Sequence, residues 1–97
     1  MEIRAATVND IKELTALMEH LGYPTTIDNM KIRFSHIKQN PYYHTLLASY
    51  EGKVVGMIGL FKGYYYEMDG CYVRIVALVV DPNYRNKGIG KKLLEEA

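Results

Sequence analysis

The sequence predicts an α/β domain with the element order β-α-α-β-β-β-α, in which a mixed, mostly antiparallel sheet carries helices on both faces. Three observations support this prediction. Apolar residues recur at helical spacing in two segments before residue 40. From Tyr43 onward, strand-forming residues alternate with glycine-containing turns, and a third helical pattern begins near Ile89. The 97 residues are enough for a single domain spanning 1–97, with one small core.

The first helix is expected after a short strand over residues 1–6. Thr7 is placed to cap it, and Asp10 stands three residues later, where a capping box has its acid. Gly22 should end the helix, and Pro24 prevents its continuation. The apolar side chains that share one face of this helix are Ile11, Leu14, Leu17, Met18 and Leu21.

The second helix is expected to begin at Thr25 or Thr26 and to end at Asn40-Pro41. Asp28 lies in its first turn, where the helix dipole favours negative charge. Its predicted buried stripe consists of Ile27, Met30, Phe34 and Ile37.

Three strands should follow, over Thr45–Tyr50, Val54–Tyr66 and Tyr72–Val80. The Asp69-Gly70 pair predicts a two-residue hairpin turn between the last two of them. The aliphatic run at 75–80 favours burial on both faces, and Cys71 is expected to be a small buried strand residue. The spacing of Ile89, Leu93 and Ala97 then predicts the third helix.

Composition narrows the possible functions. Lys and Arg total 12 and Asp and Glu total 11, and this balance argues against broad binding to nucleic acid or to an anionic membrane. A single cysteine, no signal peptide and no apolar run of membrane-spanning length indicate a cytoplasmic protein. The three histidines have unrelated spacings, so no metal site is predicted.

The segment from Val80 to Lys92 carries the chemical information, since a strand is followed by a glycine-containing loop and a helix start. Free N–H groups and the positive dipole end of such a helix favour a phosphate group. Gly88 and Gly90 allow close approach of the backbone, and Arg85 adds positive charge together with neighbouring lysines.

Two nucleotide-binding motifs do not fit this segment. A Walker A loop requires a glycine five residues before the Gly-Lys pair, where Arg85 stands, and a serine or threonine after it, where Lys92 stands. A dinucleotide fingerprint requires a third glycine after Gly88-Ile89-Gly90, and none follows. A phosphate- or nucleotide-binding module of another kind remains an alternative that binding of ATP would reveal.

The spacing Arg85-x-x-Gly88-x-Gly90 resembles the Arg/Gln-x-x-Gly-x-Gly/Ala signature of the GNAT superfamily of acyl-CoA-dependent N-acyltransferases. The likeness extends to the flanking segments 78–82 and 91–94, to the element order and to the opening residues 3–7. It implies that the chain is the N-terminal part of the fold, truncated after the third helix and lacking the later strands and helix.

The resemblance implies acetyl-CoA as co-substrate. The pantetheine arm is expected to pair with the backbone of Leu78, Val79 and Val80, on a strand that is often bulged. The pyrophosphate is expected on the loop and helix start formed by Arg85, Asn86, Lys87, Gly88, Ile89, Gly90 and Lys91. The chemistry is transfer of acetyl to an amine, driven largely by proximity and orientation.

The catalytic groups are not identified by this comparison. Some members have a glutamate where this chain has Arg74, which cannot act as a base. Glu67 and Asp69 are weak candidates near the hairpin. For the acceptor, Tyr64 and Tyr66 on one strand face and Tyr23 between the first helices are candidate pocket residues.

The resemblance therefore implies an N-acetyltransferase that acts on a primary amine of a small molecule or a protein. The alternative is a truncated CoA-binding or interaction module without turnover. An exposed strand edge at 75–80 would in that case favour a homodimer.

Overall fold

The computed structural model describes residues 1–97 and contains one four-stranded sheet. The strands are β1 (Glu2–Ala5), β2 (Tyr43–Tyr50), β3 (Lys53–Tyr64) and β4 (Cys71–Val80), in the order β1-β2-β3-β4. All three pairings are antiparallel, so no parallel pair of the expected mixed sheet occurs among these strands. The predicted order of elements is confirmed.

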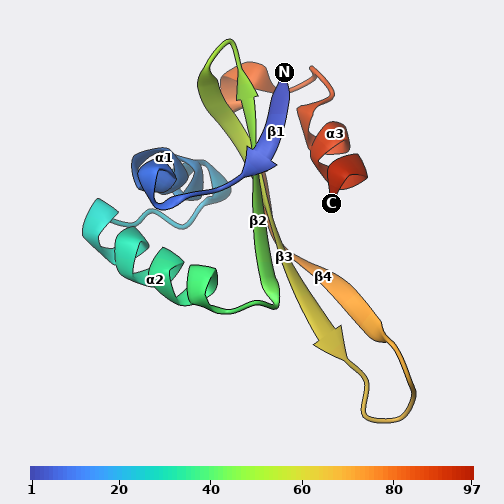
Figure 1. Ribbon diagram of the computed structural model, residues 1–97. Helices are drawn as coiled ribbons and strands as arrows, with labels where there is room; N and C mark the ends of the chain where they lie inside the picture. The colour runs from blue at the N-terminus through green and yellow to red at the C-terminus, as the bar shows by residue number, and fades with distance from the viewer.

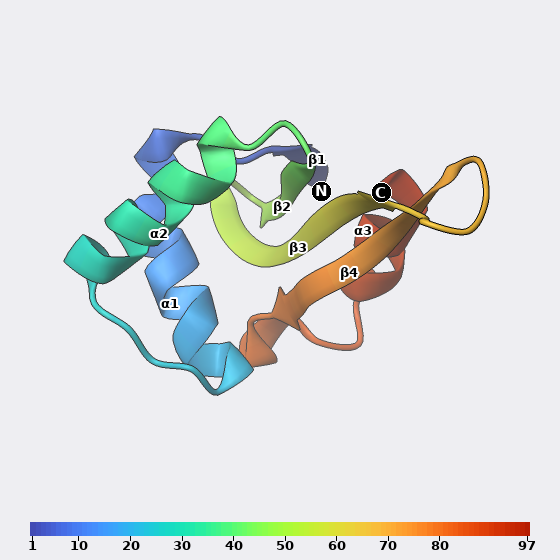
Figure 2. The same ribbon diagram turned by 90° about the horizontal axis from the view of Figure 1, so that it is seen from below.

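The helices lie on both faces of the sheet, as predicted. Helices α1 (Ile11–Leu21) and α2 (Ile27–Gln39) cover one face, and α3 (Ile89–Glu96) lies on the other (Figures 1 and 2). Short 3-10 turns at Val8–Asp10 and Pro82–Tyr84 lead into α1 and toward α3. None of these helices combines the length and apolar character that crossing a bilayer requires.

Each face of the sheet has its own core. The face under α1 and α2 has ten clustered buried residues: Ala6, Ile11, Leu14, Leu17, Met18, Met30, Phe34, Leu47, Met57 and Val79. The face under α3 has six: Ala48, Val55, Ile58, Leu60, Ile89 and Leu93. Gly56 allows α3 to pack closely, because a Cβ there would lie 3.3 Å from Ile89 Cγ2 and 3.4 Å from Leu93 Cδ1.

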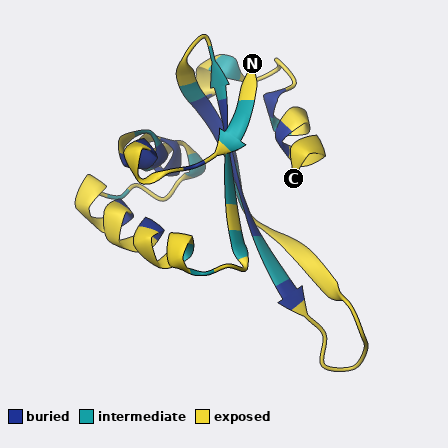
Figure 3. Ribbon diagram, viewed as in Figure 1, coloured by how far each residue is buried: buried dark blue, intermediate teal, exposed yellow.

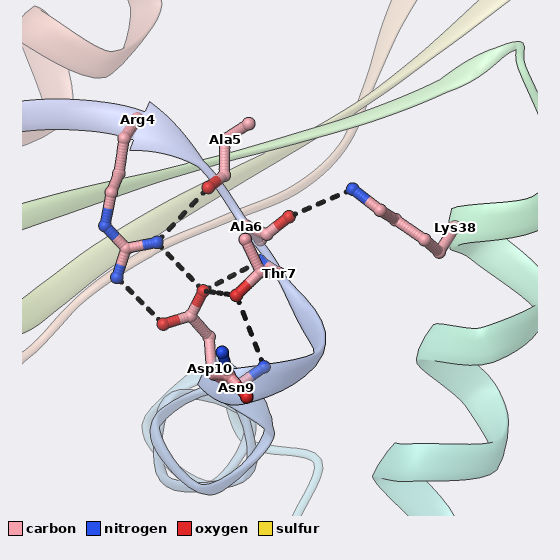
Figure 4. A network of polar contacts seen from close by, with 7 residues as sticks. All are labelled: Arg4, Ala5, Ala6, Thr7, Asn9, Asp10 and Lys38. Carbon is pink, nitrogen blue, oxygen red and sulfur yellow. Dashed lines mark hydrogen bonds and ion pairs between the residues drawn. The ribbon is translucent and has the colours of Figure 1, made fainter.

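A polar network fixes the entry into α1 (Figure 4). The Arg4 guanidinium donates to both carboxylate oxygens of Asp10, at 2.9 and 2.8 Å. The Thr7 N–H donates to Asp10 at 2.7 Å, and the Thr7 hydroxyl accepts from the Asn9 N–H, which confirms the predicted capping box. The hydrogen bonds from Arg4 outweigh desolvation and lower the pKa of Asp10 from 3.8 to about 2.

The ends of both long helices also agree with the sequence. Gly22 ends α1 with a left-handed φ of 102°, and the Thr26 hydroxyl caps α2 by accepting from the Asn29 N–H at 3.0 Å. Met30 and Phe34 are buried as predicted. Ile27 is exposed, contrary to the prediction, since it occupies the first position of α2.

The β3–β4 hairpin differs most from the prediction. Tyr64 pairs with Cys71, so residues 65–70 form a six-residue loop in place of a two-residue turn, and Tyr66 lies outside the strand. Cys71 is exposed rather than buried. The hairpin projects beyond the helices, and its tip is exposed (Figures 1 and 3). Side chains at this end therefore have no second layer to pack against.

The prediction that the aliphatic run at 75–80 is buried on both faces is also wrong for the first half of the run. Ile75 and Val76 are 48% and 47% exposed, whereas Val79 is buried. The reason is that β4 is an edge strand, and Val79 belongs to the core cluster under α1 and α2, whereas Ile75 and Val76 belong to neither core cluster.

Candidate functional site

The edge strand β4 contains a β-bulge at its centre. Gly59 pairs with Ala77 and the next residue, Leu60, pairs with Ile75, which leaves Val76 as the extra residue. This is the kind of irregularity that the sequence resemblance implied for this strand. A bulge bends the strand and redirects its side chains, and bulges often occur beside binding sites.

The loop after β4 is held by its own polar contacts. The buried Asp81 accepts a hydrogen bond from the Asn83 N–H at 2.9 Å and caps the 3-10 turn. The Arg85 side chain returns to β4, where its Nε donates to the Val80 carbonyl at 3.3 Å. Asn86 and Gly88 both have positive φ, of 66° and 75°, which turns the chain sharply into α3.

The amino end of α3 is open to a ligand. Gly88 is its N-cap residue and offers no side-chain cap. No Cβ blocks the backbone at Gly88 or Gly90, and a Cβ built on Gly90 would meet only Val80 Cγ2, at 3.9 Å. Uncapped N–H groups and the positive end of a helix dipole are features that favour an anion.

A groove of about 610 Å³ lies between this loop, β4 and the end of α1. Its lining includes eight of the predicted cofactor residues: Leu78, Val79, Val80, Arg85, Asn86, Gly88, Ile89 and Gly90. Lys87 and Lys91 do not line it. The Lys87 ammonium lies over the Tyr50 ring instead, 5.6 Å from its centroid. We call this hollow the loop groove.

Three lining residues were missed at the sequence level. Tyr84 lies within the motif segment and packs against Tyr50 with tilted rings, whose centroids are 5.8 Å apart. His20 and Leu21 come from the end of α1, and no sequence signal connects them to the loop. The His20 Nε2 atom lies 3.9 Å from Asp81 Oδ2, so α1 and the start of the loop are in ion-pair range.

A second groove, of about 830 Å³, lies beside the bulge; we call it the bulge groove. It is lined by Met18, Leu21, Gly22, Tyr23, Pro24, Met30, Arg33, Ile37, Tyr43, Thr45, Met57, Gly59, Val76 and Ala77. Leu21 lines both grooves, and Ala77 of the bulge groove is followed directly in β4 by Leu78 of the loop groove. The two grooves are therefore adjacent.

The other predicted acceptor and catalytic residues lie elsewhere. Tyr23 lines the bulge groove, but Tyr64 and Tyr66 line neither groove. Tyr64 packs edge-on against Tyr42 with ring centroids 5.9 Å apart. Glu67 and Asp69 lie in the exposed hairpin loop. No carboxylate lines either groove, and no three His, Cys, Asp or Glu side chains are arranged to hold a metal ion.

A bulged edge strand, a glycine loop and an uncapped helix end define an α/β domain whose edge carries a groove that reaches the amino end of a helix. Comparison with known proteins identifies the class. The sequence profile of the acetyltransferase (GNAT) family matches residues 9–97. The chain belongs to this family of acetyltransferases.

Individual relatives agree with this assignment. The spermine/spermidine N(1)-acetyltransferase of Bacillus subtilis strain 168 is 31% identical, over 98% of this chain and 64% of its own. The thialysine N-epsilon-acetyltransferase of Mus musculus is 30% identical, over 89% of this chain and 54% of its own. The chain thus spans less than two thirds of the length of these curated relatives.

The fold is shared with solved structures. A GNAT family acetyltransferase from Staphylococcus aureus superposes with a TM-score of 0.91 at 35% identity, over 98% of this chain and 73% of that one. The glucosamine-6-phosphate N-acetyltransferase of Arabidopsis thaliana has a TM-score of 0.80 at 23% identity, over 98% of this chain and 69% of that one. The second likeness shows the fold alone.

Proposed function

We propose that this chain transfers an acetyl group from acetyl-CoA to a primary amine. The observation that carries the proposal is that two adjacent grooves meet on β4, one open to an anion and the other largely apolar. The pyrophosphate would lie at Gly88 to Gly90 and the pantetheine arm along Leu78 to Val80. The acetyl thioester would then reach the junction of the grooves at Leu21.

The protein's contribution to this reaction is largely positional. The amine nitrogen forms a bond to the thioester carbon, the C–S bond breaks, and the thiolate takes up a proton. Holding both reactants in adjacent grooves supplies the proximity that such a transfer requires. The amine must also lose a proton, because its solution pKa is about 10.

We place proton transfer on side chains that line the grooves. Glu67 and Asp69 lie in the hairpin loop and line neither groove. His20 and Tyr84 line the loop groove, and Tyr23 and Tyr43 line the bulge groove. These are the side chains on which we place proton transfer. The free thiol of Cys71 is exposed, which suits the reducing cytoplasm that we propose as the site of action.

Calorimetric titration of acetyl-CoA tests the cofactor part. Gly90→Glu places a carboxylate where the pyrophosphate would bind, and the open space at this position lets the fold accept it. We expect the affinity to fall by at least about tenfold, as for a like charge in a phosphate site. Ile32→Glu, on the exposed face of α2, adds the same charge as a control. If Gly90→Glu and Ile32→Glu bound acetyl-CoA with the same affinity, the proposal would be contradicted.

Self-association without turnover is the second candidate. Val73, Ile75 and Val76 are 62%, 48% and 47% exposed on the edge strand, and an apolar strand edge favours pairing between chains. We expect light scattering to show a dimer that Val76→Lys dissociates, because a lysine on an edge opposes pairing. A monomer at millimolar concentration would exclude this candidate.

A further inference from the structure

The bulge groove has an unusual charge distribution for a site that receives an amine. Among its lining residues, Arg33 is the one with a formal charge, and no carboxylate is present. The remaining polar side chains are Tyr23, Tyr43 and Thr45. A cationic amine that enters this groove therefore meets a cation and no counter-charge.

The guanidinium of Arg33 is not engaged by an acid. Its Nη2 donates to the Thr25 hydroxyl at 3.4 Å, and its Nη1 lies 4.0 Å from the Met30 sulfur. Arg33 takes part in no ion pair, and Asp28 in the first turn of α2 does not reach it. Because arginine remains protonated at all working pH values, it keeps most of its donor capacity for a ligand.

We propose that the acceptor is a primary amine that also carries a carboxylate, with Arg33 binding that carboxylate. The proposal rests on the proposed function, since it takes the bulge groove as the acceptor site. The planar guanidinium can donate two parallel hydrogen bonds to a carboxylate. The apolar wall formed by Met18, Met57 and Ala77 would contact the chain between the two ends of the acceptor.

The same geometry disfavours polyamines. A second ammonium group in this groove would approach Arg33 with no acid to offset the repulsion, and like charges in contact lower affinity. An amino acid, or the side-chain amine of a peptide with a nearby carboxylate, satisfies both ends. The specificity of this chain is therefore inferred to differ from that named for its Bacillus relative.

Three probes of equal chain length isolate the charge at the far end: 6-aminohexanoate, hexylamine and 1,6-diaminohexane. Each is titrated into the isotopically labelled protein without cofactor, and binding is followed by NMR shifts of residues in the bulge groove. We expect 6-aminohexanoate to bind about tenfold more tightly than 1,6-diaminohexane, with hexylamine between them. The free energy of a hydrogen bond to a charged group corresponds to about this ratio of affinities.

Two variants assign the preference to one side chain. Arg33→Gln should abolish the tenfold preference, and Arg33→Lys should restore part of it by keeping the charge without the fork. Lys31→Gln removes the same charge from α2 outside the groove and should leave the preference intact. Since Arg33 is exposed, the variants should fold, and circular dichroism checks this.

The outcomes separate this inference from the proposed function. Equal or tighter binding of the diamine, an unchanged preference in Arg33→Gln, or shifts confined to other surfaces would overturn the carboxylate inference. None of these results involves the loop groove. Failure of acetyl-CoA to bind would instead overturn the proposed function, and it is measured in a separate titration.

Discussion

The two faces of the sheet are secured to different degrees. On the α1–α2 face, two long helices enclose ten buried residues, and the Arg4–Asp10 network fixes the chain entry. On the other face a single eight-residue helix covers six. Both grooves border β4. This strand lies at the open edge of the sheet (Figure 2).

This difference indicates how the domain combines stability with binding. A ligand that pairs with backbone needs unpaired N–H and C=O groups, and these occur at strand edges and helix ends. Groups of that kind add nothing to the folded core until a ligand occupies them. We therefore expect the α1–α2 face to supply most of the stability, and we place ligand binding on β4 and the start of α3.

The largest expected effect comes from truncating a buried leucine on each face. Leu14 and Leu93 are 1% and 0% exposed, so the side chains are matched in burial. We expect Leu14→Ala to lower the free energy of unfolding by about 4 kcal/mol and Leu93→Ala by about 2 kcal/mol, because a short single helix can settle into the space left behind. Urea unfolding monitored by circular dichroism measures both.

Leu14→Ala and Leu93→Ala should also differ in their effect on the affinity for acetyl-CoA. Leu93→Ala is expected to weaken acetyl-CoA binding because Leu93 anchors the helix whose amino end faces the loop groove. Leu14→Ala should leave the affinity of the folded fraction unchanged. A larger stability loss from Leu93→Ala than from Leu14→Ala would contradict the proposed asymmetry.

A smaller effect is expected from Asp10→Asn. The folded-state pKa of Asp10 is lowered from 3.8 to about 2, so its ionised form contributes stability above the unfolded pKa and loses it as pH falls toward 2. The shift corresponds to about 2 kcal/mol at pH 7, and about half of this remains at pH 3.

Denaturation at pH 7 and at pH 3 measures this difference between wild type and variant. Asp28→Asn, which removes an exposed acid from α2, serves as the control and should change stability little at either pH. If the difference in unfolding free energy between wild type and Asp10→Asn stayed constant between the two pH values, the prediction would be wrong. The interaction between Arg4 and Asp10 would then contribute no stability that depends on the ionisation of Asp10.

Predictions from the sequence agree with the structure where the interactions involved join residues that are close together in the chain. Thr7 with Asp10, Gly22 and Thr26 mark helix ends through contacts within a few residues, and all were predicted correctly. The prediction of a two-residue hairpin turn was wrong. Asp69-Gly70 fits a tight turn locally, but the pairing of Tyr64 with Cys71 leaves a longer loop.

By itself, the sequence determined the element order and the position of the glycine loop that leads into α3, because capping, glycine conformation and helical periodicity act over one or two turns. Only the tertiary structure decided that His20 and Leu21 line the loop groove and that Arg33 is the one charge in the bulge groove. It likewise decided that Ile75 and Cys71 are exposed. The physical reason is that burial and site composition depend on which distant elements pack together, and a strand's own residues do not specify how far its neighbours extend.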